Sequence, residues 1–121
     1  MKIEIHKGNL IIANNAKLCK NFFFKAKGLM FTKPLSNGSA LILESPTQGI
    51  LDTTIHMMFV FYPLNIVWLN SNKVVVDIQK KVKPFKPWLS PKKPAKYVLE
   101  LPCSTNCIKI GDKLEFKQKG I

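Results

Sequence analysis

One histidine stands out in this sequence as a residue that could take part in chemistry. His56 is the one ionisable side chain in the otherwise apolar stretch from Ile55 to Tyr62. A polar group in such a place must be hydrogen-bonded or face a cavity. The commoner outcome is a structural histidine that bonds a backbone carbonyl, and the alternative is a site that binds a small polar molecule.

A pocket around His56 would take its other groups from neighbouring strands. Asn65 follows on the next strand and Glu100 lies on another, while Trp68 and Trp88 supply aromatic surface. We predict a non-catalytic domain in which these five residues line a shallow pocket. The pocket is expected to accept a small polar or anionic ligand and no cofactor.

Signatures of common enzymes are missing from the sequence. The chain contains no GxGxxG, P-loop, GxSxG or HExxH pattern. Its seven acidic residues are scattered, although a spatial pair such as Glu44 and Glu100 stays open. An enzyme of unknown reaction is therefore an alternative hypothesis, with His56 and Glu100 as its candidate residues, and we assign no catalytic residue.

The cysteines predict neither a disulfide framework nor a metal site. Cys103 and Cys107 have a spacing compatible with half of a zinc site, but only His6, His56 and Cys19 remain as typical further donors. Three cysteines are also an odd number. Because the amino terminus lacks the apolar run of a secretory signal, we expect reduced thiols and a cytoplasmic protein.

The segment from Lys80 to Lys96 is the most unusual stretch of the chain. Its seventeen residues include seven lysines, four prolines and no acid, so we predict an extended surface loop. Phe85, Trp88 and Tyr97 alternate with these lysines, which resembles the surface of single-strand nucleic-acid binders. The candidate contacts are Lys80, Lys81, Lys83, Lys86, Lys92, Lys93 and Lys96.

A polyanion-binding accessory protein is therefore the second hypothesis, and it has a simpler competitor. The net charge is +12, and lysine supplies every basic residue. Lysine gives a hydrated point charge and not the flat fork that reads bases, so we expect at most weak, non-specific binding. The simpler explanation is a solvated loop whose aromatic side chains lie against the domain.

The pattern of the remaining residues predicts the elements that position these groups. Ile3 to Ala13 alternates around a Lys-Gly-Asn turn, which predicts an opening hairpin. Apolar residues at spacings of three and four between Leu18 and Leu29 predict one short helix, capped by Asn14 or Asn15 and ended by Gly28.

The rest of the chain predicts strands. The expected strands are Ala40–Glu44, Thr54–Tyr62, Asn65–Leu69, Val74–Gln79, Tyr97–Leu101 and a last alternating run, Lys113–Lys117. Many short strands and one helix favour a single mainly β domain over residues 1–121, a sandwich or barrel. No apolar run is long enough to span a bilayer, so we expect no membrane partner, and a monomer by default.

Several phrases of the sequence, taken together, resemble one family. They are Lys27-Gly28-Leu29-Met30-Phe31, Ile55-His56-Met57-Met58, the run from Tyr62 to Leu69, Lys86-Pro87-Trp88, the run from Tyr97 to Pro102 and Ile110-Gly111-Asp112. Their order and spacing are similar to uncharacterised protein family 0127, or domain of unknown function 192, over roughly Ala16 to Leu114. The resemblance implies a jelly-roll-like β-sandwich or barrel of prokaryotic origin, and no activity.

Two positions depart from that family pattern. Asn65 stands where the family usually has aspartate, which removes a charge that would suit a cation or acid-base role. Cys103 and Ser104 stand where alanine and glycine are frequent. Roles implied by the resemblance at these positions are therefore weakened here.

Overall fold

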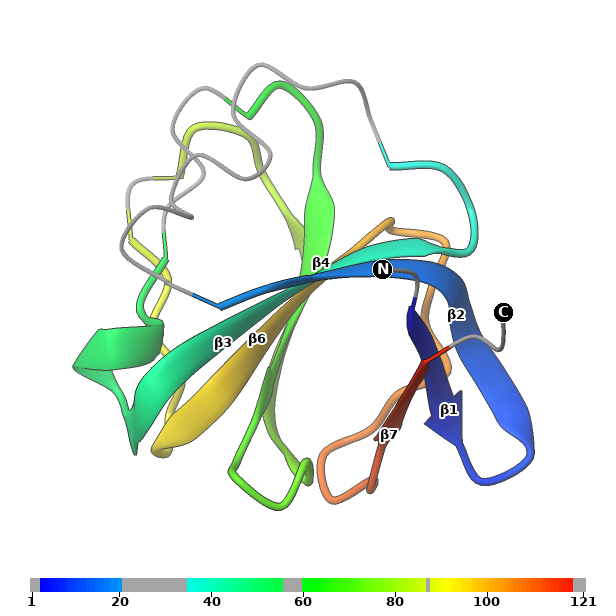
Figure 1. The fold of residues 1–121 in the computed structure, drawn as a ribbon. Coiled ribbons are helices and arrows are strands. Elements are labelled where there is room, and N and C mark those ends of the chain that lie inside the picture. Colours follow the sequence, from blue (N-terminus) through cyan, green and yellow to red (C-terminus); the bar gives the residue numbers. More distant parts are fainter. Residues whose placement is uncertain (1–2, 21–34, 56–59, 87, 119–121) are drawn as a thin grey trace.

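The computed structural model describes residues 3–20, 35–55, 60–86 and 88–118, and within them seven strands form one sheet (Figure 1). The strand order is β5-β4-β6-β3-β2-β1-β7, and β2 with β3 is the parallel pair in this otherwise antiparallel sheet. The bounds are β1 Ile3–Lys7, β2 Leu10–Cys19, β3 Ser39–Gly49, the 3-10 helix η2 Leu51–Thr53, β4 Leu64–Leu69, β5 Val75–Val82, β6 Ala95–Leu101 and β7 Glu115–Gln118. The expectation of a mainly β fold is confirmed.

Two predicted hairpins are present. β1 pairs with β2 across the turn at Gly8, and β4 pairs with β5. In the second turn the Oδ1 of Asn70 accepts hydrogen bonds from the backbone N–H groups of Asn72 (2.9 Å) and Val74 (3.0 Å). Asparagine favours turns because its short side chain can bond the backbone ahead of it in this way.

The predicted helix is wrong at its beginning. Asn14, Asn15 and Leu18 belong to β2, whose residues 15–19 pair in parallel with residues 39–43 of β3. Tertiary pairing outweighs the weak helical spacing, because a strand in a sheet bonds all its backbone groups and alternates its side chains between two faces. The remainder of that helix, through Gly28, lies outside the described residues.

Two further boundaries differ from prediction. Within the described part of the expected strand Thr54–Tyr62, Ile55 forms an isolated bridge with Leu89, and residues 60–62 form no strand. β5 continues to Val82 and β6 begins at Ala95, so strand structure enters both ends of the segment predicted as a loop. No helix within the described ranges is long and apolar enough to cross a membrane.

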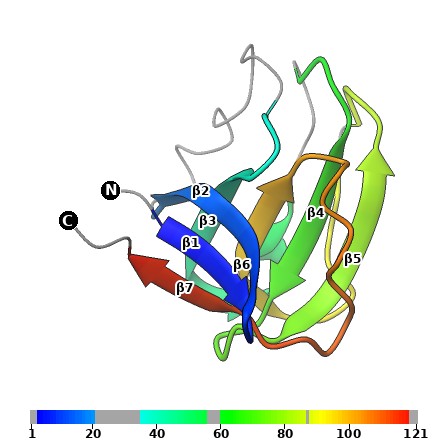
Figure 2. The same cartoon turned by 90° about the vertical axis from the view of Figure 1, so that its right-hand side faces the viewer.

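The sheet carries an apolar core on each side. One core includes Ile5, Ile42, Leu99 and Leu114 and lies on what we call the barrel face. The other includes Leu43, Ile66, Trp68, Leu89 and Val98 and lies on the loop face, which the segments around η2 and between β5 and β6 cover. Figure 2 shows the curvature that gathers β1, β2 and β7 on one side of the molecule.

The barrel face is partly enclosed because the chain before β7 bonds to β5, although the sheet does not close. Val75 donates to the carbonyl of Asp112 (2.8 Å) and accepts from Gly111 (2.8 Å), and Leu114 donates to the carbonyl of Lys73 (2.9 Å). Gly111 has a φ of 96°, a conformation that favours glycine. This contact joins the two ends of the strand order without a full ladder.

Candidate functional site

The side chain of Glu100 carries the one buried side-chain polar atom of the described residues that has no hydrogen-bond partner. The residue is 7% exposed, and its Oε2 atom has no partner among the described residues. Burial raises the pKa of Glu100 to about 7. Desolvation explains this direction, because a carboxylate without a bonded partner loses the hydration that favours its charged form.

Glu100 lies in a row of side chains that crosses the loop face. On its two sides in the sheet lie Leu41 of β3 and Ile66 of β4, both buried. Lys17 pairs with Leu41, and Gln79 pairs with Ile66, so both belong to the same row. With neighbouring strands about 4.8 Å apart, each of these polar residues stands two strands, or roughly 10 Å, from Glu100.

The row therefore places three polar groups along one line. Lys17 is exposed and Gln79 is partly exposed, while Glu100 between them is buried and flanked by aliphatic side chains. A carboxyl group with an apolar surround and a cation at the distance of two strands can bind a hydrogen-bond donor and an anionic group of the same molecule. We treat Lys17, Glu100 and Gln79 as the candidate site.

Trp68 lies in the next row of the same face but is occupied by a structural contact. It is fully buried, and its Nε1–H donates to the carbonyl of Thr53 at 2.8 Å. The hydroxyl of Thr53 in turn donates to the carbonyl of Gly49 (2.8 Å). Trp68 thus fastens η2 to the sheet, and its N–H is not available to a ligand.

Asn65 lies on the opposite face from Glu100. Leu64 and Ile66 belong to the loop-face core and Val67 to the barrel-face core, so alternation turns Asn65 toward the barrel face. The register of β4 with β5 sets Asn65 opposite two residues, Lys80 and Lys81, which is a β-bulge.

The side chain of Asn65 stabilises that bulge and the loop after β6. Its Oδ1 accepts the N–H of Lys81 at 2.8 Å, where Lys81 has a φ of 51°. Its Nδ2 donates to the carbonyl of Thr105 at 2.7 Å, with a longer contact of 3.5 Å to that of Cys103. An aspartate could not donate these last bonds, so the amide has a structural use that a carboxylate would not fulfil.

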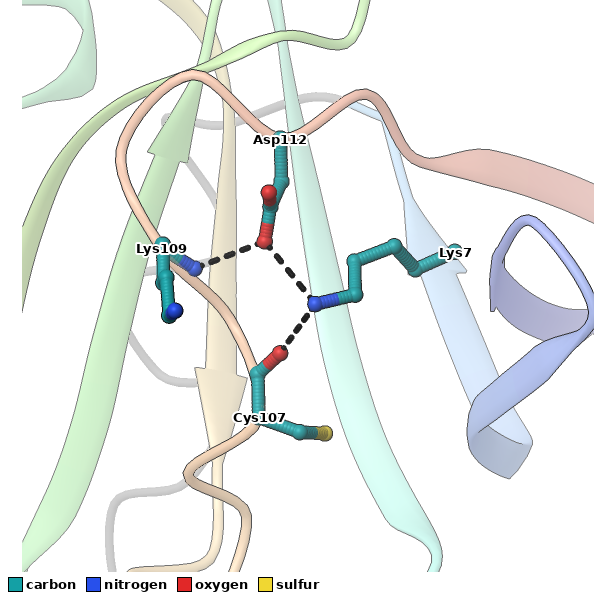
Figure 3. A network of polar contacts seen from close by, with 4 residues as sticks. All are labelled: Lys7, Cys107, Lys109 and Asp112. Carbon is teal, nitrogen blue, oxygen red and sulfur yellow. Dashed lines mark hydrogen bonds and ion pairs between the residues drawn. The ribbon is translucent and has the colours of Figure 1, made fainter.

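The loop after β6 is also held at its other end. The Oδ2 of Asp112 accepts the N–H of Lys109 (2.8 Å) and the ammonium of Lys7 (3.2 Å), and Lys7 also donates to the carbonyl of Cys107 (2.7 Å), as Figure 3 shows. The hydrogen bond from Lys109 and then the ammonium of Lys7 hold the pKa of Asp112 below its usual range. The carboxylate of Asp112 thus bonds the backbone three residues before it and joins this turn to β1.

The structure brings only part of the predicted pocket together. Trp68 and Glu100 share the loop face in adjacent rows, Asn65 lies on the other face, and His56 lies outside the described residues. Trp88 lies in the segment between β5 and β6 and is 71% exposed. The ligand-binding role of these residues stays a prediction.

The predicted polyanion contacts divide into two groups. Six of the lysines are exposed: Lys80, Lys81, Lys83, Lys86, Lys92 and Lys93. Lys96 is partly buried, where its Nζ lies 3.4 Å from the carbonyl of Pro46 and 3.9 Å from the carboxylate of Glu44. Of the three aromatic residues predicted to alternate with these lysines, Phe85 and Trp88 are exposed, whereas Tyr97 is buried in the barrel-face core.

Sequence reasoning missed Lys17 and Gln79. Lys17 falls at the start of the segment predicted as a helix, but the structure places it in β2, where it is exposed. Gln79 was the last residue of a correctly predicted strand.

The described residues include no group of three His, Cys, Asp or Glu side chains that could hold a metal ion.

The comparisons with known proteins give a family and a fold. A family model described as DUF192, Uncharacterized ACR, matches residues 3–116. A UPF0127 protein of Pyrococcus furiosus is 34% identical over 107 residues, covering 84% of this chain and 86% of that protein. A UPF0127 protein of Pyrococcus abyssi is 35% identical over 105 residues, covering 83% and 84%.

Two crystal structures are similar to this fold. A protein of unknown function from Novosphingobium aromaticivorans has a TM-score of 0.80 and 24% identity, covering 93% of this chain and 82% of its own. A protein of Sinorhizobium meliloti, described as a candidate transcription regulator, has a TM-score of 0.79 and 18% identity, covering 94% and 91%. At these identities the likeness concerns the fold alone.

Proposed function

Since the chain belongs to the DUF192 family of uncharacterised proteins, whose description carries no activity, we propose a function from its own geometry: the domain binds a small polar ligand at Glu100. The observation that supports this most is the buried Oε2 of Glu100 without a partner among the described residues. Leaving such a group unsatisfied costs roughly 1–3 kcal/mol, so an unpaired buried polar group is a candidate for a functional one.

The row across the loop face suggests the class of ligand. Glu100 would accept a hydrogen bond from an ammonium, amide or hydroxyl group, and Lys17 would attract an anionic group about two strands away. Leu41 and Ile66 would contact the apolar part between them. A small zwitterion, such as an amino acid or a related amino-carboxylate, combines these features.

Protonation gives the proposal a specific signature. Near pH 7 about half of the Glu100 carboxyl groups hold a proton, given a pKa of about 7. A ligand that donates a hydrogen bond or brings a cation favours the ionised form and must release protons when it binds. A ligand that accepts a hydrogen bond from the neutral carboxyl would take protons up.

A thermal-shift screen of small zwitterions, amines and carboxylates, followed by calorimetry, tests this function. A ligand that binds only the folded protein at 100 times its Kd stabilises it by about 2.7 kcal/mol, which is readily measured as a rise in Tm. Calorimetry in buffers of different ionisation enthalpy should show proton release near pH 7. Glu100→Gln and Lys17→Met should each weaken binding.

The matched control is Glu115→Gln, which removes the same charge from an exposed carboxylate on β7. It should bind the selected compound as the unchanged protein does. Binding that survives Glu100→Gln, or a complete screen without a hit, contradicts the proposed site. If the protein consumed the compound, the proposed binding domain would instead be an enzyme.

We also propose that the protein works in the cytoplasm. Cys19, Cys103 and Cys107 are free thiols, and two of them are at least partly exposed. Exposed free thiols suit a reducing compartment. Cell fractionation with an antibody against the protein tests this, and recovery in an extracytoplasmic fraction would refute it.

A further inference from the structure

Three large aromatic side chains in or beside the lysine-rich segment are exposed to solvent. Trp88 is 71% exposed, Phe61 is 58% exposed and Phe85 is 43% exposed. The rings of Phe61 and Phe85 meet edge to face, with centroids 5.0 Å apart and planes at 85°. Phe85 has a φ of 64°, a conformation rare for an aromatic residue. We call Phe61, residues 83–86 and residues 88–93 the lysine-aromatic surface.

Hydrogen bonds and one buried side chain hold the backbone of this surface against the rest of the domain. Leu89, directly after Trp88, is 1% exposed, and it exchanges two backbone hydrogen bonds of 2.9 Å with Ile55. The hydroxyls of Thr54 and Ser90 lie 2.9 Å apart, and the N–H of Lys92 donates to the Oδ2 of Asp77 (3.0 Å). The anchored backbone presents Trp88 to solvent, so a partner would meet a ring carried on an ordered segment of chain.

The charge around these rings is positive and uncompensated. Lys83, Lys86, Lys92 and Lys93 are exposed, and no ion pair involving them occurs within the described part of the chain. The segment from 80 to 96 contains no acidic residue, and the whole chain has a net charge of +12. Polyanions are therefore attracted to the side of the molecule where the aromatic rings are exposed.

We propose that the lysine-aromatic surface binds single-stranded nucleic acid without sequence preference. Exposed rings stack on unpaired bases, whose faces a duplex hides within its own stack, and lysines contact the backbone phosphates. The absence of arginine from the chain fits a surface that does not read base edges. A purely acidic peptide would use the lysines but would leave the rings in water.

The two tryptophans give a direct readout of this stacking. Trp68 is fully buried and Trp88 is exposed, so a base that stacks on Trp88 quenches one of two fluorescence signals. Titration with an oligothymidine of about 20 nucleotides in about 50 mM salt should quench the protein with micromolar affinity. Trp88→Phe should leave the Trp68 signal unquenched and retain binding, while Trp88→Ala should weaken binding on the order of ten-fold.

A pair of double variants separates this surface from bulk charge. Lys83→Ala with Lys86→Ala should weaken binding and flatten the slope of log K against log salt by about 1.4, at about 0.7 per lost phosphate contact. Lys113→Ala with Lys117→Ala removes the same charge just before and within β7, a strand that Figure 1 shows on the other side of the molecule from the segment between β5 and β6. This second pair should change the slope much less.

Several outcomes would overturn the proposal. These are no binding near 50 mM salt, equal effects of the two double variants, no quenching of Trp88, or equal affinity for heparin or anionic vesicles. Equal affinity for a duplex would also contradict stacking as the basis. Glu100→Gln should leave oligonucleotide binding unchanged, so the failure of this proposal and of the ligand proposal can be told apart.

Discussion

Asn65 and Glu100 are both buried on central strands of the sheet, one facing the barrel core and the other facing the loop core. Both ends of the Asn65 amide bond to backbone groups, whereas Oε2 of Glu100 has no partner among the described residues. Burial alone therefore does not separate a structural polar residue from a functional one. Hydrogen-bond satisfaction distinguishes these two residues, because a satisfied polar group contributes to folding and an unsatisfied one costs free energy.

The largest effect of this difference is expected at Asn65. Asn65→Ala leaves the N–H of Lys81 and the carbonyl of Thr105 without their partners, which at about 2 kcal/mol each lowers the free energy of unfolding by about 4 kcal/mol. Urea denaturation measures this loss. A loss below about 1 kcal/mol would mean that water replaces both bonds and that Asn65 is not a structural anchor.

Asn65→Asp sharpens the same comparison. The aspartate can still accept the N–H of Lys81, but it cannot donate to the carbonyl of Thr105, so the expected loss lies between those of Ala and the unchanged protein. Stability equal to that of the unchanged protein would show that the amide donor is dispensable.

The next effect concerns Glu100 and depends on pH. Its pKa is about 7 in the folded protein, above the usual 4.5, so the folded state keeps its proton between these values while the unfolded chain loses it. The contribution of Glu100 is complete below pH 4.5 and is lost as the pH rises through 7. The free energy of unfolding should fall by up to about 3 kcal/mol over that window.

Glu100→Gln should remove this pH dependence and make the protein more stable than the unchanged chain at pH 8. Denaturation curves at pH 5 and pH 8 for both proteins measure the effect, and Glu115→Gln provides the exposed control. If Glu100→Gln kept the pH dependence of the unchanged protein, Glu100 would not be the source of that dependence. Its carboxyl group would then have to contact a group that satisfies its hydrogen bonding. The contrast between the two faces would then be lost.

The sequence predicted the positions of the strands better than it predicted the sheet face on which each residue lies. Alternation and the Asn70 turn identified the hairpin of β4 and β5, since both signals are local. The helix at Asn14 failed because β2 is held by parallel pairing with β3, a contact that no local pattern encodes. The partial enclosure by residues 111–114 depends on the same kind of distant pairing.

Residue type identified one member of the candidate site, Glu100. The other two members depend on strand register, which the sequence did not predict. Glu100 was named as a polar residue on a predicted strand, and its Oε2 has no partner among the described residues. Asn65 and Trp68 differ by three positions, so on one regular strand they must face opposite sides, and alternation would have separated them. Lys17 enters the row of Glu100 only through the registers of β2 with β3 and β3 with β6.

The smallest expected effect lies at the edge of the barrel face, where Asp112 joins the loop after β6 to β1 through Lys7. The bond from Lys109 and the ammonium of Lys7 lower the pKa of Asp112, so its contribution to stability is present above its ordinary pKa and is lost as the pH falls through the lowered value. Asp112→Asn should therefore lower Tm slightly at pH 7, and the difference should shrink toward pH 2. Because this carboxylate is solvated, high salt should reduce the part due to Lys7. A difference that persists in strong acid would mean that the turn geometry at Asp112, and not its charge, closes this side of the barrel face.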